Sequence, residues 1–193
     1  SLFYIYLIMP LAHISSQKRI QKGDLKEFET LFKCYYEPLC RYANSFVKDM
    51  DMAEELVQEF FYNYWKNRES ITIQLSLKSY LYRSIRNSAL RYLEHLAVRQ
   101  RYADSVKASV SETDTLTPTD ELELTELNRV IEDTLNQLPE RCREIFTLSR
   151  FEGLKYHEIA DALSISVKTV EANMAKALQL FRKNLQQYDR LAV

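Results

Sequence analysis

Glycine occurs only twice in this chain of 193 residues, at Gly23 and Gly153, and this scarcity limits the folds that the chain can adopt. Average glycine usage in proteins is about 7%. Doubly wound nucleotide-binding folds, P-loops and all-β barrels need glycine where the backbone turns with positive φ or approaches a phosphate closely. The sequence therefore predicts an all-α protein with polar turns, and its 46% of apolar residues is enough to build packed cores.

The first apolar stripe with helical spacing runs over residues 25–46. Pro38 interrupts this stripe. Because proline removes a backbone donor and clashes with the preceding turn, we expect either a kink or two abutting helices near Glu37.

Two further helices are expected in the first half of the chain. One should begin at Asp51, which has capping-box spacing to Glu54, and end near Asn67. Residues 68–75 are β-branched and polar without a long apolar run, so they predict an ordered loop. The next helix is expected to begin after Ser76 and to have a clear core face.

The outer face of this third helix carries arginines and aromatic rings. Arginines can pair with phosphates, tyrosines can stack on bases, and an asparagine can hydrogen-bond to a base edge. A helix whose arginines only keep it soluble is the alternative. The residues expected to contact DNA are Tyr80, Tyr82, Arg83, Arg86, Asn87 and Arg91.

Charge is distributed in blocks, although the formal net charge is only −1. Residues 24–59 carry nine acidic and four basic residues, whereas residues 78–107 carry seven basic and two acidic ones. Residues 108–126 carry six acidic residues and no basic one, and residues 168–190 are basic again. Two basic blocks separated by an acidic one suit a protein that touches a polyanion at two places.

The acidic block is rich in Ser and Thr and has no aromatic residue, which is typical of a flexible linker. Residues 1–8 are apolar but too short to span a membrane and without signal-peptide features, and we expect them to be readthrough or tag sequence. The expected organisation is an N-terminal extension, a first helical domain, the flexible acidic linker, a second helical domain and a tail: 1–20, 21–105, 106–125, 126–188 and 189–193.

A helix-turn-helix is predicted near the C-terminus. A short helix over residues 156–163, a turn at Ser164 and Ile165, and Ser166 as the cap of a longer helix have the required spacing. Ser164 stands where such turns often have glycine. The alternative is a helical hairpin without DNA contact.

The outer face of the longer helix suits the major groove in size and chemistry. Lysine reaches phosphate or guanine, asparagine can pair with adenine, glutamate can accept from cytosine, and methyl groups can meet thymine. The residues expected to contact DNA here are Lys168, Thr169, Glu171, Ala172, Asn173 and Lys176.

Cysteine and histidine show no site pattern. Cys34, Cys40 and Cys142 are odd in number and lack C-x-x-C spacing, and the three histidines lie far apart in sequence. We expect free thiols in a reducing cytoplasm, with no disulfide, metal site or cofactor. Because no nucleophile, base and orienting group stand at readable spacing, no catalytic residue is assigned and an enzyme is not expected.

Two segments resemble the conserved regions of bacterial sigma factors. The residues that resemble region 2 are Asp51, Ala53, Glu54, Glu55, Leu56, Val57, Gln58, Glu59, Phe61, Trp65, Tyr80, Leu81, Tyr82, Arg83, Ile85, Arg86 and Asn87. The residues that resemble region 4 are Leu138, Pro139, Arg143, Phe146, Gly153, Glu158, Ile159, Ala160, Leu163, Ile165, Ser166, Thr169, Val170 and Ala177. With both regions in order and no domain between them, the chain is similar to the extracytoplasmic-function group of the sigma-70 family over residues 21 to about 188.

The resemblance implies promoter recognition together with core RNA polymerase in the cytoplasm, without a small-molecule substrate. The third helix and residues 68–77 would open the −10 element, residues 168–176 would read the −35 element, and the linker would run toward the RNA exit path. An anti-sigma factor, often a membrane protein, is the implied regulator. The residues implied to bind polymerase are Asp51, Glu55, Gln58, Glu59 and Tyr62.

Three other functions stay open from the residues alone. A response-regulator or quorum-type activator also carries a helix-turn-helix, but its receiver would need a parallel α/β sheet that this glycine-poor chain does not favour. An enzyme is the second alternative. A helical adaptor that binds only protein is the third, and it would not change the promoter choice of polymerase.

Overall fold

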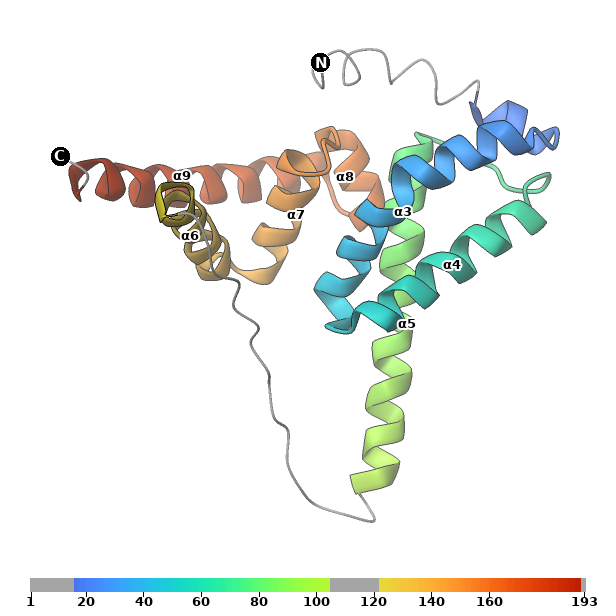
Figure 1. The fold of residues 1–193 in the computed structure, drawn as a ribbon, viewed down its shortest axis with the longest axis horizontal. Helices are drawn as coiled ribbons and strands as arrows, with labels where there is room; N and C mark the ends of the chain where they lie inside the picture. The colour runs from blue at the N-terminus through green and yellow to red at the C-terminus, as the bar shows by residue number, and fades with distance from the viewer. Residues whose placement is uncertain (1–15, 105–121, 192–193) are drawn as a thin grey trace. The chain divides into compact units, whose positions relative to one another are not determined.

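The computed structural model describes residues 16–104 and 122–191, and within these ranges every regular element is a helix. The all-α class predicted from the sequence is confirmed. Side chains are described for residues 16–99 and 128–186. The labelled helices (Figure 1) are α3 (Leu25–Val47), α4 (Met50–Lys66), α5 (Leu77–Asp104), α6 (Leu122–Gln137), α7 (Glu140–Arg150), α8 (Tyr156–Leu163) and α9 (Val167–Leu191).

The helices fall into two compact units. Helices α3, α4 and α5 belong to the first unit, and α6, α7, α9 and most of α8 belong to the second. Most of the expected linker, residues 106–121, lies outside the described residues. We expected the linker to end at Thr125, but α6 begins earlier, at Leu122. Leucine and glutamate are good helix formers, and here they extend the helix into the polar segment.

Helix α3 passes through Pro38 without a break. Figure 1 shows that the axis of α3 changes direction part-way along. The structure therefore has a kinked helix, which is one of the two expected outcomes, and not two abutting helices. Proline explains the bend, because its ring clashes with the carbonyl one turn earlier. Lys48 ends the helix in the left-handed conformation, with φ of 56°.

The N-cap of α4 lies two residues before the predicted one. Asp49, not Asp51, is the N-cap, and its carboxylate accepts a hydrogen bond from the Met52 backbone N–H at 3.1 Å. Both aspartates suit a cap chemically, so the sequence did not distinguish them. The helix ends at Lys66 as expected, and Ser76 caps α5 by accepting from the Ser79 N–H at 3.1 Å.

Aromatic rings form much of the core of the first unit. The Phe61 ring lies 4.9 Å from Phe32 and 6.1 Å from Phe28, joining α4 to α3. The Phe28 ring also contacts Trp65, at 4.8 Å between ring centres. Edge-to-face and tilted ring pairs of this kind stabilise a core beyond the area that they bury.

The second unit packs α9 against α6 and α7. The rings of Phe146 and Phe181 stack at 4.5 Å between centres, and the surrounding core is mostly aliphatic. A buried polar link joins α6 to α9, since the Asn184 amide donates to the Thr134 hydroxyl at 2.9 Å. Buried polar groups need such partners, so this link fixes how the two helices pair.

A helical turn over residues 16–21 precedes α3. Gly23, with φ of 89°, turns the chain into Asp24, which caps α3 by accepting from the Glu27 N–H at 3.1 Å. The rest of the expected N-terminal extension, residues 1–15, lies outside the described residues. Among the helices that the structure describes, none combines the length and apolar character needed to cross a membrane.

Candidate nucleic-acid interface

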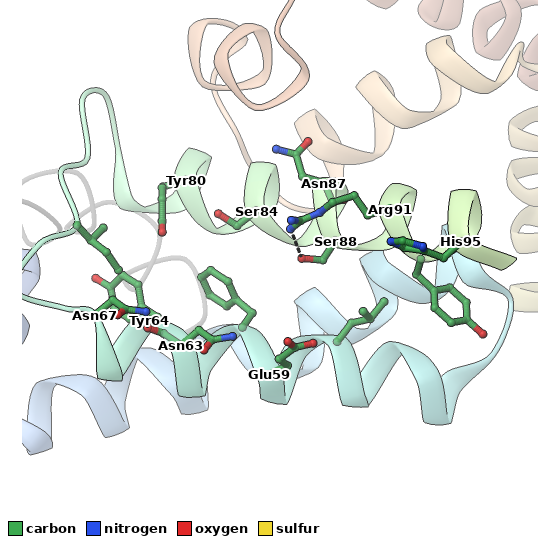
Figure 2. A pocket seen from close by; sticks show the side chains of 14 residues that line it. Glu59, Asn63, Tyr64, Asn67, Tyr80, Ser84, Asn87, Ser88, Arg91 and His95 are labelled. Atoms are coloured by element: carbon green, nitrogen blue, oxygen red, sulfur yellow. Dashed lines mark hydrogen bonds between the residues drawn. The ribbon is translucent and has the colours of Figure 1, made fainter. Parts of the chain in front are cut away.

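A groove of about 680 Å³ runs between α4 and α5 in the first unit. Figure 2 shows its labelled side chains arriving from both helices, with Asn63 and Tyr64 from α4 and Tyr80, Ser84 and Arg91 from α5. One end is lined by Asn67 and Ile71 of the segment before α5. The lining residues are Leu56, Glu59, Phe60, Asn63, Tyr64, Asn67, Ile71, Tyr80, Ser84, Asn87, Ser88, Arg91, Tyr92 and His95.

Aromatic rings line the part of the groove nearest the core. The Tyr80 ring lies 6.0 Å from Tyr64 and 6.1 Å from Phe60. Burial raises the pKa of the Tyr64 hydroxyl to about 12, and it raises the pKa of Tyr80 as well. The Tyr80 ring is half-buried and presents apolar surface on which a base can stack, whereas Tyr64 is only 3% exposed and supports that ring from the core.

Amide, hydroxyl and guanidinium groups line the rest of the groove. The Arg91 guanidinium is exposed and is oriented by its own helix. It donates to the Asn87 carbonyl at 3.3 Å, and Figure 2 shows its hydrogen bond to the Ser88 hydroxyl, at 3.4 Å. Asn87 is exposed and carries both donor and acceptor groups. This half of the groove can therefore hold a phosphate and hydrogen-bond a base edge.

Only some of the α5 residues predicted to contact DNA line the groove. Tyr80, Asn87 and Arg91 line the groove, and Arg83 is exposed on α5. Arg86 is half-buried on the same helix.

Tyr82 was predicted to contact DNA, and its position in the structure contradicts this. The residue is 1% exposed, and its ring lies 5.1 Å from that of Tyr42 on α3. A ring packed in this way offers no face to a base. Tyr82 directly follows the core residue Leu81 in sequence. Because α3 packs against this side of α5, Tyr82 is buried together with Leu81.

Sequence reasoning missed the α4 wall of the groove. Asn63 and Asn67 lie four residues apart, and Ser84 and Ser88 repeat the same spacing on α5. That spacing was the available signal, because residues four apart share one helix face. The spacing does not show which helix lies opposite, however, so from the sequence these four residues look like ordinary solvent-exposed positions.

The predicted helix-turn-helix has the predicted limits. Helix α8 covers Tyr156–Leu163 and α9 begins at Val167. Ser164 takes a left-handed conformation with φ of 54°, the conformation that glycine adopts most easily. Ser166 caps α9 by accepting from the Thr169 N–H at 3.1 Å, and the two hydroxyls lie 2.8 Å apart.

The first three turns of α9 present the predicted reading face. Its inner side is buried at Val170, Met174 and Ala177. Five of the six predicted residues are exposed, and Asn173 is half-buried with its amide donating to the Thr169 carbonyl at 2.8 Å. The exposed residues are Lys168, Thr169, Glu171, Ala172 and Lys176.

A third surface follows the outer side of α4. The residues predicted there to bind polymerase are all exposed, and Tyr62 is 64% exposed with the Lys66 ammonium 5.8 Å from its ring centre. Gln58 donates to the Tyr36 hydroxyl at 3.0 Å, which ties this surface to α3. Glu59 also lies at the edge of the groove. The five residues, hereafter the α4 stripe, are Asp51, Glu55, Gln58, Glu59 and Tyr62.

Family descriptions match both units. "Sigma-70 region 2" matches residues 31–98 and "Sigma-70, region 4" matches residues 128–181. Among curated proteins, the chain is 28% identical over 176 residues to the ECF RNA polymerase sigma-E factor of Haemophilus influenzae, covering 88% of this chain and 93% of that one. It is 29% identical over 178 residues to the RNA polymerase sigma-H factor of Pseudomonas aeruginosa, covering 88% and 91%.

Solved structures share the fold. The sigma factor RpoE of Bartonella quintana, in complex with the anti-sigma factor NepR, matches with a TM-score of 0.59 and 22% identity, covering 83% of this chain and 98% of that one. CnrH, in complex with the cytosolic domain of CnrY, matches with a TM-score of 0.56 and 22% identity, covering 89% and 96%. With both conserved regions present in order on an all-α fold, the chain belongs to the extracytoplasmic-function group of the sigma-70 family and directs promoter-specific initiation by core RNA polymerase.

Proposed function

We propose that the two units of this sigma factor divide promoter recognition between opening and reading. In this proposal the groove between α4 and α5 captures an unstacked base of the −10 element, while the start of α9 reads the duplex of the −35 element. The observation that carries the proposal is the groove itself, which combines the half-buried ring of Tyr80 with the exposed amide of Asn87 and the exposed guanidinium of Arg91.

The chemistry of the groove suits a single strand. Separating a base from its stack costs a few kcal/mol per step, and a ring surface with hydrogen-bonding groups returns part of that cost. Arg91 supplies positive charge for the backbone, whereas Glu59 on the opposite helix would repel it. We therefore expect the strand's phosphates to follow α5, with Arg83 and Arg86 extending the basic path.

Helix α9 suits a duplex for a different reason. Its reading face is held by caps within its own first turns, so it needs no rearrangement to enter a major groove. Lys168 and Lys176 would contact phosphate or guanine, Asn173 an adenine, Thr169 and Ala172 thymine methyl groups, and Glu171 a cytosine. Which of these meets a base depends on the −35 sequence.

Core RNA polymerase joins the two sites. The α4 stripe is the surface that we propose docks on the polymerase, because it is exposed and separate from the core face of α4. The proposed domains are residues 16–105, which include the turn before α3, and residues 122–188, which start with α6, and they are joined by residues 106–121. Tethering on polymerase raises the effective concentration of each domain at its promoter element, so two modest sites act together.

An anti-sigma factor is the proposed regulator. RpoE and CnrH were each solved in a complex, the former with the anti-sigma factor NepR. We propose that a partner of this class, free or anchored in the membrane, covers the α4 stripe and thereby blocks polymerase. The chain itself would act in the cytoplasm as a non-catalytic initiation factor without cofactor, because the polymerase supplies the catalysis.

Run-off transcription tests the division of labour. Full-length chain and core polymerase are supplied with a promoter library, and wild type is compared with Asn87→Ala, Arg91→Ala and Lys168→Ala. The two α5 variants should lose initiation on every promoter that needs opening, whereas Lys168→Ala should lose it only on promoters with particular −35 sequences. If wild type initiates no better than core polymerase alone, the assignment fails. Lys183→Ala, which removes an exposed lysine from the far part of α9, is the matched control.

A further inference from the structure

The loop between α4 and α5, residues 67–76, is fixed firmly at both ends. At its start, the Arg68 guanidinium lies 4.5 Å over the Trp65 ring and donates to the Trp65 carbonyl at 2.9 Å. A turn follows, closed by the Ser70 N–H donating to the Asn67 carbonyl at 3.0 Å. At its end, Ser76 caps α5.

The middle of the loop is held from another part of the sequence. The Gln21 side-chain amide donates to the Ile71 carbonyl at 2.8 Å, and the Gln17 amide lies 3.5 Å from the same oxygen. Both glutamines lie on the helical turn over residues 16–21, one turn apart and on one face. They are about fifty positions from Ile71 in the chain.

The turn that carries these glutamines is itself rigidly placed. Ile20 is fully buried in the first unit. On the exposed side, the Arg19 guanidinium pairs with the carboxylates of Asp24 at 2.9 Å and Glu27 at 2.8 Å. The two ion pairs tie the turn to the start of α3 and the burial of Ile20 fixes its inner side, so the turn can hold the loop against a fixed support.

Ile71 is also part of the groove, because its side chain lines the end nearest the loop. We propose that the turn over residues 16–21 is a brace that positions this wall of the groove for strand opening, with Gln21 as the main positioning residue and Gln17 as a weaker second donor. This inference rests on the proposed function of the groove. It assigns a role in initiation to a segment that precedes the region 2 match at residue 31.

The brace should affect opening rather than docking. A neutral amide donor to a carbonyl contributes a modest net free energy, and here that energy limits the positions that the loop can take. Without it, the loop visits more conformations and the groove is preformed less often. The α4 stripe and the face of α9 contain no part of this contact, so binding to polymerase and to duplex promoter should not change.

The test compares two templates of one promoter that wild type is able to use. One is fully duplex, and the other has mismatched strands over the −10 element and the start site. Open complexes are counted for full-length wild type, Gln21→Ala, Gln21→Glu and the double variant Gln17→Ala/Gln21→Ala, each with core polymerase. Gln179→Ala, the same chemical change at an exposed position on α9, is the matched control.

Loss of the brace should reduce open complexes on the duplex template by about twofold to tenfold, as one net hydrogen bond permits. The loss should be less than about twofold on the mismatched template, which needs no opening. The double variant should lose at least as much as Gln21→Ala, and Gln179→Ala should behave as wild type. Thermal unfolding followed by Trp65 fluorescence checks that the Gln17 and Gln21 variants are folded, and circular dichroism checks Gln179→Ala.

Two results would overturn the brace alone. One is an unchanged yield of open complexes on the duplex template in the double variant, and the other is an equal loss on both templates, which indicates a general structural role. If Asn87→Ala and Arg91→Ala also leave the duplex yield unchanged, the groove itself is not the site of opening. The proposed function of the groove and the brace then fail together.

Discussion

The two units of this sigma factor build their nucleic-acid surfaces in opposite ways. In the first unit, the groove is assembled from α4, α5 and the loop between them, and its floor is continuous with the aromatic core. In the second unit, the reading face lies on one helix, and its caps come from residues within four positions of each other. The first surface depends on tertiary packing, whereas the second is largely local.

This difference suits the two tasks. A base that has left its stack needs a shaped, apolar and hydrogen-bonding enclosure, which a single helix cannot provide. A duplex offers its own groove, so the protein needs only a rigid helix with suitable side chains. It follows that substitutions in the aromatic core should disturb opening, while substitutions in the second core should disturb reading.

The largest effect is expected from core truncation. Phe61→Ala removes a ring packed on Phe28 and Phe32 and should lower the free energy of unfolding of the first unit by about 3–5 kcal/mol. Ile145→Ala, at a fully buried position, should lower that of the second unit by about 2–5 kcal/mol. Urea titration followed by Trp65 fluorescence reports the first unit alone, because this is the chain's one tryptophan. A shift of the Trp65 transition in Ile145→Ala would show that the units unfold together.

A smaller effect is expected from alkali acting on Tyr64 in the first unit. Because the pKa of Tyr64 is raised to about 12 in the folded protein, the unfolded chain releases this proton from about pH 10, well before the folded chain does. Unfolding is therefore favoured as pH rises from about 10 to 12, by about 2 kcal/mol across the window. Tyr64→Phe keeps the ring and removes the titrating hydroxyl, so its stability should exceed that of wild type increasingly over this range. Parallel curves for the two proteins would contradict the assignment.

The smallest effects are expected at the helix caps. Asp49→Ala and Ser166→Ala should each lower the free energy of unfolding of their own unit by about 1 kcal/mol, because each leaves a first-turn N–H without its side-chain acceptor. Trp65 fluorescence should detect the change at Asp49 but not the change at Ser166, which circular dichroism would register. Ser166→Thr keeps the hydroxyl and should restore most of the loss. Equal stability of Ser166→Ala and wild type would mean that the cap of α9 is not needed to form the reading face.

The helix-turn-helix could be predicted because its signals are local. Ser166 caps its own helix, and Ser164 takes the left-handed turn between two periodic segments. The cap of α4 was misplaced by two residues because Asp49 and Asp51 are equally suitable caps, and the choice depends on how the helix buries Ala53, Val57 and Phe61. The bend at Pro38 was predicted only as one of two outcomes, since continuity of α3 depends on its packing against α4.

The groove could be predicted only in part. Its α5 face was visible as a helical repeat of arginine, asparagine and tyrosine. Tyr82 was misassigned because its burial depends on Tyr42, forty residues earlier, and Asn63 was missed because its partner helix was unknown. The contact between Gln21 and Ile71 spans 50 positions, and neither residue carries a motif that points to the other.

Composition and periodicity determined that this chain is helical, where its turns lie and which face of α9 is free, because caps, turns and amphipathic spacing act between residues a few positions apart. Tertiary structure decided which side chains of α4 and α5 line one groove and that Tyr82 is buried in the core. It also decided that the turn over residues 16–21 holds the loop before α5. Those outcomes depend on contacts between distant segments, whose free energy is set by how the helices pack and not by any local pattern.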